Sequence, residues 1–137
     1  NTEPGSSSAH LGLWGAYYKK GMYVEALAEA RKHFEIIHEP EVVEALARGF
    51  EEGGYQRAMS QGAAVFEAES QRRYIPGVRL ARMHAHAGGN DRALYWLNIA
   101  FERHESPLSR LAVFWDWDTL RSDPRFQALL RRMNLPQ

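Results

Sequence analysis

The chain has 137 residues, of which 45% are hydrophobic, 12% aromatic and 25% charged, a composition that indicates one globular domain and excludes a disordered chain. Seventeen basic and seventeen acidic side chains cancel, so no net charge attracts nucleic acid or an anionic membrane surface. The absence of cysteine excludes disulfides and thiolate chemistry.

The first eight residues are polar and rich in Pro, Gly and Ser, which is typical of a linker. They lack the basic start and apolar core of a signal peptide, and the sequence has no apolar run of the roughly 20 residues that a membrane helix needs. We therefore expect a linker at residues 1–8, no membrane insertion, a cytoplasmic location, and a piece that belongs to a longer chain.

The first predicted helical hairpin spans about residues 9–38. Apolar residues recur at helical spacing from about His10 and the pattern ends at Lys19-Lys20-Gly21, which predicts the first helix. The second helix is predicted from Tyr23 to His38, because the residue before Pro40 avoids the α region.

A second hairpin is predicted over about residues 39–73. Its first helix begins at Pro40 and breaks at Gly53-Gly54, and its partner helix spans about Tyr55 to Gln71. Two further glycines, Gly49 and Gly62, fall inside these helices, where each costs about 1 kcal/mol relative to Ala. We expect close packing of neighbouring helices at both positions.

The third predicted hairpin covers about residues 74–106. Its first helix begins near Tyr74 and ends at Gly88-Gly89. The second helix, from Arg92 to His104, follows a predicted cap at Asn90-Asp91, since Asn and Asp favour that position.

Residues 107–137 leave this pattern and are predicted to cap the last hairpin. Asp123-Pro124 predicts a helix start, with an N-cap residue followed by proline at the first helical position. Residues 111–120 are interpreted as a short helix or turn that holds aromatic rings over the end of the stack. Its two Trp-Asp dipeptides, at 115–118, indicate either aromatic packing in the cap or an exposed docking patch.

A short pattern, Gly-x-Tyr-x-x-Ala, returns along the chain at a nearly constant interval. It occurs at Gly21, Tyr23 and Ala26, at Gly53, Tyr55 and Ala58, and in looser form at Gly88, Asn90 and Ala93. The glycines suit a left-handed turn, and the alanines are small enough for close helix contact. This period of about 34 residues, built from two helices and a turn, resembles the tetratricopeptide repeat.

The resemblance extends to the C-terminus. The runs GNDRALYWL at 89–97 and LRSDPRFQALLRRMNLP at 120–136 look like the C-terminal segment of bacterial tetratricopeptide regions. Such regions are attached to signalling proteins, including Ser/Thr kinases and winged-helix transcription regulators. The resemblance implies an all-α superhelical stack of three hairpins plus a capping helix, serving as an interaction scaffold or regulatory module without chemistry of its own. The sequence departs from the repeat at two positions of each hairpin. The position in the first helix that usually has a small residue carries Trp14, Leu46 and Ala81, and the phenylalanine position of the second helix carries Ala30, Gly62 and Leu97.

An enzyme would have to use the six histidines and seventeen carboxylates. His84 and His86 are two residues apart, which places them about 200° from each other on a helix and prevents chelation of one metal. No nucleophile elbow, phosphate loop or dinucleotide fingerprint is present. We expect no enzymatic activity, no metal and no cofactor. The arginines near the C-terminus are interpreted as a solvated helix face, with a phosphate site as the alternative: Arg121, Arg125, Arg131 and Arg132.

The predicted function is binding of a protein or peptide segment in a concave groove lined by the first helix of each hairpin. The residues expected to face this groove are Tyr18, Lys19, Val43, Ala47, Phe50, Glu51, Val78, Arg82 and His86. Two alternatives remain: a small-molecule sensor with an aromatic pocket between the third hairpin and the cap, and a homodimerisation module.

Overall fold

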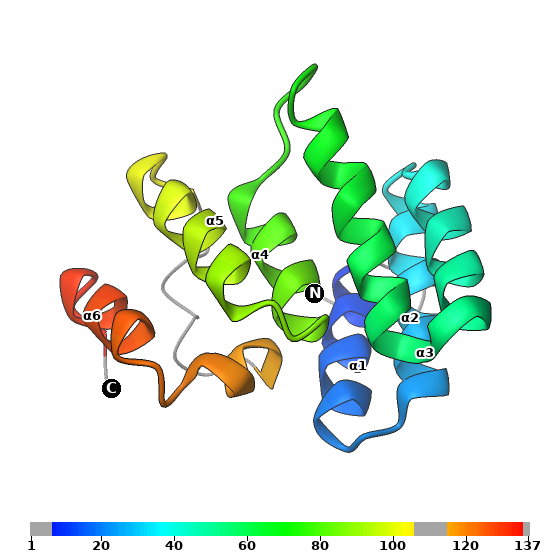
Figure 1. Cartoon of the computed structure of the whole chain (residues 1–137), viewed down its shortest axis with the longest axis horizontal. Coiled ribbons are helices and arrows are strands. Elements are labelled where there is room, and N and C mark those ends of the chain that lie inside the picture. Colours follow the sequence, from blue (N-terminus) through cyan, green and yellow to red (C-terminus); the bar gives the residue numbers. More distant parts are fainter. Residues whose placement is uncertain (1–6, 106–114, 136–137) are drawn as a thin grey trace.

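The computed structural model describes residues 7–105 and 115–135, and every regular element within them is helical (Figure 1). The all-α class predicted from the sequence is therefore confirmed. The elements are α1 (Ser7–Lys19), α2 (Tyr23–Ile36), α3 (Pro40–Glu69), α4 (Gly77–His86), α5 (Asn90–Glu102), the 3₁₀ helix η2 (Trp115–Leu120) and α6 (Pro124–Arg132).

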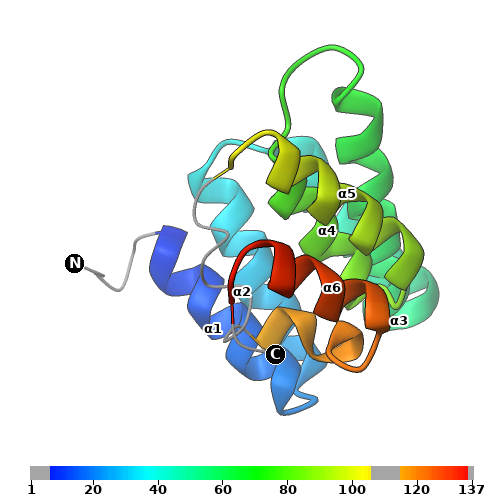
Figure 2. The same cartoon turned by 90° about the vertical axis from the view of Figure 1, so that its left-hand side faces the viewer.

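The helices pair in the order in which they occur along the chain. α1 packs along α2, α4 packs along α5, and α3 contacts both α2 and α4. Non-helical backbone at Gly53 and Gly54 divides α3 into two halves, so the expected break is present. Near the C-terminus, η2 lies against α1 and α4, and α6 contacts α5 (Figure 2).

Left-handed glycines mark the turns of the three hairpins, as the repeated pattern predicted. Gly21 has a φ of 75°, Gly54 a φ of 85° and Gly88 a φ of 83°. The middle turn differs by one residue from the prediction, because Gly53, with a φ of −158°, is in the extended region. The residue that needs to be glycine in this turn is thus Gly54.

Small residues let the two halves of α3 approach each other closely, and let α4 approach α3. A Cβ atom on Gly49 would lie only 2.7 Å from the Cα atom of Ala58, and one on Gly62 only 2.5 Å from the Cε atom of Met83. The alanines of the repeated pattern, Ala26, Ala58 and Ala93, are fully buried. The predicted close packing at both glycines is confirmed.

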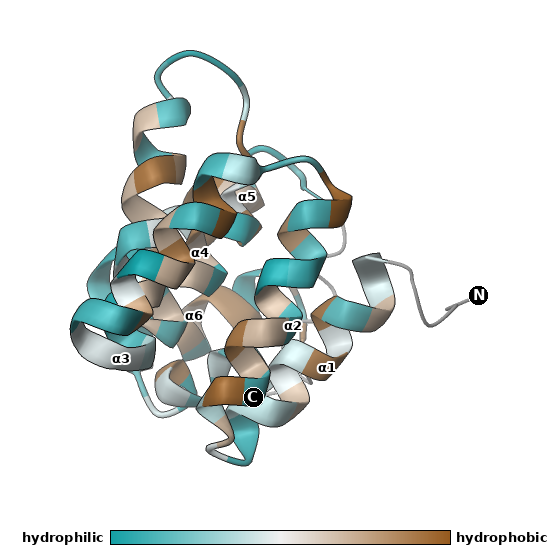
Figure 3. Ribbon diagram, turned by 90° about the vertical axis from the view of Figure 1, so that its right-hand side faces the viewer, coloured by the Kyte–Doolittle hydropathy of each residue, from teal (hydrophilic) through white to brown (hydrophobic). Residues whose placement is uncertain are grey.

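The core runs through all the helices and is rich in aromatic rings. Its largest fully buried side chains include Trp14, Phe34, Phe66, Trp117 and Phe126. Figure 3 shows hydrophilic residues on outer helix turns and on the connection between α3 and α4. Among the described residues, none of the helices combines the length and the apolar character needed to cross a membrane.

Several predicted helix ends are shifted by a few residues. Ser7 and Ser8, expected in the linker, belong to α1, and His33 on α2 binds the carbonyl oxygen of Ser7 at 2.9 Å. The other expected linker residues, 1–6, lie outside the described residues. α2 and α5 stop two residues before their predicted ends, because His38 and His104 adopt positive φ angles of 63° and 58°.

The two predicted helix caps have different outcomes. α6 begins as predicted, because the Asp123 side chain accepts a hydrogen bond from the Arg125 amide at 2.9 Å. The expected cap at Asn90-Asp91 is wrong, since both residues are already inside α5 and its N-cap is Gly89. The amide group of Asn90 instead reaches the carbonyl oxygen of Thr119 at 3.4 Å.

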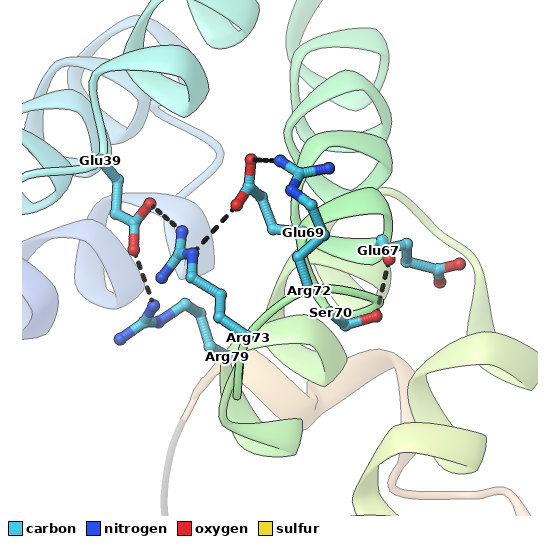
Figure 4. A network of polar contacts seen from close by, with 7 residues as sticks. All are labelled: Glu39, Glu67, Glu69, Ser70, Arg72, Arg73 and Arg79. Carbon is cyan, nitrogen blue, oxygen red and sulfur yellow. Dashed lines mark hydrogen bonds and ion pairs between the residues drawn. The ribbon is translucent and has the colours of Figure 1, made fainter.

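An ionic cluster joins the start of α3 to its end and to α4 (Figure 4). Glu39 accepts hydrogen bonds from Arg73 at 2.8 Å and from Arg79 at 3.2 Å, and Arg73 also binds Glu69 at 3.0 Å. Because Glu39 is buried, its two cations balance a charge that would otherwise be costly. The cluster therefore fixes the position of α4 relative to α3.

Candidate functional site

A chain of four buried polar side chains crosses the interior between α1, α3, α4 and η2. Trp14 Nε1 donates to the Tyr55 hydroxyl at 2.8 Å, and this hydroxyl lies 2.5 Å from His86 Nδ1. His86 Nε2 lies 2.7 Å from Oδ1 of Asp116. An ionised carboxylate can only accept, so His86 Nε2 carries the proton and Nδ1 accepts from Tyr55. Each donor in this chain therefore faces an acceptor.

The charges in this cluster follow from burial and from Arg82. Burial lowers the pKa of His86 and raises the pKa of Tyr55, so both side chains are neutral at pH 7. Burial alone would raise the pKa of Asp116, but the charge of Arg82 and the hydrogen bond from His86 outweigh it and lower the pKa to about 2. Asp116 is thus ionised, and Arg82 Nε, 3.5 Å from Oδ2, supplies the balancing charge.

Aromatic side chains bring the first and third hairpins into direct contact at this cluster. The Tyr18 ring stacks on the His86 ring with centroids 3.8 Å apart, and the Trp14 centroid is 5.0 Å from that of His86. In a linear stack of repeats, each unit contacts only its neighbours. This chain differs from such a stack because the side chains of Trp14 and Tyr18 are long enough to reach α4 from α1.

η2 covers the sides of α1 and α4 that meet at this cluster. Trp117 is fully buried, and its ring lies 5.7 Å from the guanidinium carbon of Arg82. Lys19 Nζ binds Oδ2 of Asp118 at 2.8 Å and lies 5.5 Å from the ring centroid of Trp115. Residues 115–118 are therefore held by side chains of two helices that are distant in sequence.

The nine residues predicted to face a groove fall into two groups. Tyr18, Lys19, Arg82 and His86 come together at η2, and two of these, Arg82 and His86, are buried. The remaining five lie on α3 and at the start of α4: Val43, Ala47, Phe50, Glu51 and Val78. Val43, Phe50 and Val78 are half-buried and pack against the core, Ala47 is half-buried, and Glu51 is exposed.

The polar role of four side chains was not predicted from the sequence: Trp14, Tyr55, Asp116 and Asp118. The sequence signal that could have indicated this role was the presence of two carboxylates within an aromatic capping segment, because a buried charge needs a partner. The two Trp-Asp dipeptides differ in exposure, and the interpretation as a docking patch stays a prediction. Trp117 packs in the core, whereas Trp115 is 47% exposed.

His84 and two of the C-terminal arginines are engaged in contacts away from this cluster. His84 lies 2.6 Å from Glu67, while His86 lies against Asp116, so the two rings have different surroundings. Within residues 7–105 and 115–135, no group of three or more His, Asp and Glu side chains is placed to hold a metal ion. Carboxylates pair with two of the C-terminal arginines: Arg121 binds Asp118, and Arg125 binds Asp91 and Asp123.

Comparison with known proteins returned no matching family model, no matching curated protein and no matching solved structure.

Proposed function

We propose that this chain is a protein-interaction module of the tetratricopeptide type, which binds a peptide segment of a partner on the face of α1 and α4. One observation carries the proposal: a peptide segment, the six residues of η2, already lies on this face. Four residues selected from the sequence as peptide-binding contact that segment or stack against its partners, namely Tyr18, Lys19, Arg82 and His86.

The exposed residues around the end of α1 have the composition of a binding surface. Tyr23 is 46% exposed and stacks on Tyr55 with centroids 4.9 Å apart, and it lies in the same group of rings as Tyr18. Met22 and Trp115 are also exposed there. Aromatic residues and Met are enriched at protein interfaces, where rigid rings bury a large area at low entropic cost.

The buried hydrogen-bond chain favours a binding role over a catalytic one. Tyr55 and His86, the groups that could transfer a proton, are both buried and are occupied by Trp14 and Asp116. A general acid or base must come within hydrogen-bond reach of its substrate. Here the same groups hold helices and η2 together.

The test is an unbiased peptide-display selection against the immobilised full chain, followed by affinity measurements on two charge-reversal variants. Lys19→Glu changes the proposed face, and Lys32→Glu on α2 is a matched control, since the two side chains are 52% and 55% exposed. Both are made in a chain that also carries Asp118→Asn, because Lys19→Glu alone would repel Asp118 and release η2 as well. We expect selected peptides to bind Lys19→Glu at least tenfold more weakly and Lys32→Glu with unchanged affinity. Equal affinity for both variants, or a selection that returns no binding peptide, would contradict the proposal.

A further inference from the structure

The contacts of η2 define the chemistry that the face of α1 and α4 accepts. Its carboxylates alternate with its indole rings, and each group meets a donor or a cation. Asp116 faces His86 and Arg82, and Asp118 binds Lys19. The two tryptophans of η2 lie near the same cations, Trp115 near Lys19 and Trp117 near Arg82. Cations placed over ring faces are attracted to them, so the face suits an acidic and aromatic sequence.

The fit of η2 on this face is incomplete. Arg82 Nε and Trp117 Nε1 are buried and have no hydrogen-bond partner. Arg82 Nε lies 3.5 Å from the Asp116 carboxylate, at the outer limit for a hydrogen bond. Buried donors without acceptors reduce the stability of the arrangement that contains them. Of these two donors only Arg82 belongs to the face, and a segment that supplies an acceptor to Arg82 Nε would make a contact that η2 does not make.

The backbone of η2 contributes little to holding it in place. A 3₁₀ helix has poorer hydrogen-bond geometry than an α-helix, and η2 is only six residues long. Its position therefore depends on the side-chain contacts described above and on the burial of Trp117 and Leu120. A segment tethered within the same chain competes with a free ligand as if present at about millimolar concentration. Weakening the contacts of η2 should consequently raise the affinity for an added peptide.

We infer that the partner segment is an acidic, aromatic peptide in which carboxylates and indole rings alternate, and that η2 is its internal competitor. This inference rests on the proposed function and specifies the partner for the same face. The carboxylates of the partner would take the places of Asp116 and Asp118, and its rings those of Trp115 and Trp117.

The experiment uses the full chain and a fluorescent peptide with the sequence of residues 115–121, WDWDTLR, followed by anisotropy. Asp118→Asn removes the ion pair between Lys19 and η2 without changing the shape of the side chain. Asp91→Asn is the control, because the carboxylate of Asp91 is 86% exposed on α5. Loss of a surface ion pair corresponds to an affinity change of about twofold to fivefold. We expect Asp118→Asn to bind the peptide tighter by this factor than the wild type, and Asp91→Asn to match the wild type.

A second peptide, in which both aspartates are replaced by asparagine, tests the chemistry of recognition. We expect it to bind Asp118→Asn at least tenfold more weakly than the parent peptide, since both charged contacts are lost. Adding Lys19→Glu to Asp118→Asn should weaken binding of the parent peptide similarly. Equal affinity for the two peptides, or no binding of either, would overturn the inference.

Two further outcomes identify a different occupant. If display-selected peptides require Lys19 but are neither acidic nor aromatic, the inference fails while the proposed function stands. If Asp118→Asn becomes a dimer by sedimentation velocity, at concentrations where the wild type is a monomer, a second copy of the chain is the occupant and the inference is overturned. If no peptide of any kind binds, both proposals fail.

Discussion

Gly49→Ala tests how closely the two halves of α3 approach each other. The added Cβ atom would lie 2.7 Å from the Cα atom of Ala58, 2.9 Å from the carbonyl oxygen of Arg57 and 3.0 Å from the Ala58 nitrogen. All three atoms belong to the backbone, so a side-chain rotation cannot relieve the contact and the helix halves must separate. Overpacking of this kind typically costs about 1–3 kcal/mol.

Helix propensity opposes this cost, because alanine is about 1 kcal/mol better than glycine inside a helix. Gly12→Ala supplies the matched control. Gly12 is exposed inside α1, and a Cβ atom there would meet nothing within 4 Å. Because both variants gain the same propensity, the difference between them isolates the steric cost of Gly49→Ala.

The assay is urea unfolding at 25 °C, followed by circular dichroism for the wild type and both variants. We expect Gly12→Ala to raise the free energy of unfolding by up to about 1 kcal/mol. Gly49→Ala should then lie about 1–3 kcal/mol below Gly12→Ala, with an unchanged denaturant slope. Equal stability of the two variants would show that the halves of α3 are further apart than described here.

Three further predictions concern the polar groups. Tyr55→Phe should lower the free energy of unfolding by about 1–3 kcal/mol, because Trp14 Nε1 and His86 Nδ1 would be buried without a partner; calorimetry checks this. Asp123→Ala should cost about 1 kcal/mol by removing the α6 cap, and Asp123→Asn much less, as measured by urea unfolding. Burial lowers the pKa of His33 from its ordinary value of 6.5 to about 4. The unfolded chain therefore takes up this proton at a higher pH than the folded chain does, so the free energy of unfolding falls as the pH drops from about 6.5 to 4. His33→Gln should reduce this loss, as measured by unfolding midpoints at pH 7 and pH 5.

The sequence could predict the helical hairpins because their signals are local. A glycine that ends a helix, a buried alanine and a proline at a first turn each act within a few residues. Gly21 and Gly88 have the expected left-handed backbone, and α3 begins at Pro40. The errors are also local: the repeated pattern placed the turn glycine at Gly53, whereas Gly54 has the left-handed backbone, and Asn90, expected as a cap, is the first residue of α5.

The candidate site could not be predicted in the same way, because its contacts join distant residues. Tyr55 is 41 residues from Trp14, and Asp116 is 30 residues from His86. Helical periodicity placed His86 on the side expected to face a groove. Helical periodicity contains no information about which later segment covers that side. The position of η2 depends on the length and charge of side chains that meet only after the hairpins have formed.

The polarity of the buried chain links this fold to its proposed role. Hydrogen bonds run in one direction from Trp14 through Tyr55 and His86 to Asp116, where the negative charge faces Arg82. If η2 left without replacement, the His86 N–H group would lose its acceptor and Arg82 would lose its counter-ion on a face that also carries aromatic rings. Removing one partner of a buried ion pair costs much more free energy than the intact pair contributes to stability. If the proposed partner binds this face, exchange should therefore be easier than prior release of η2, because the incoming carboxylate would take the place of Asp116 as η2 leaves.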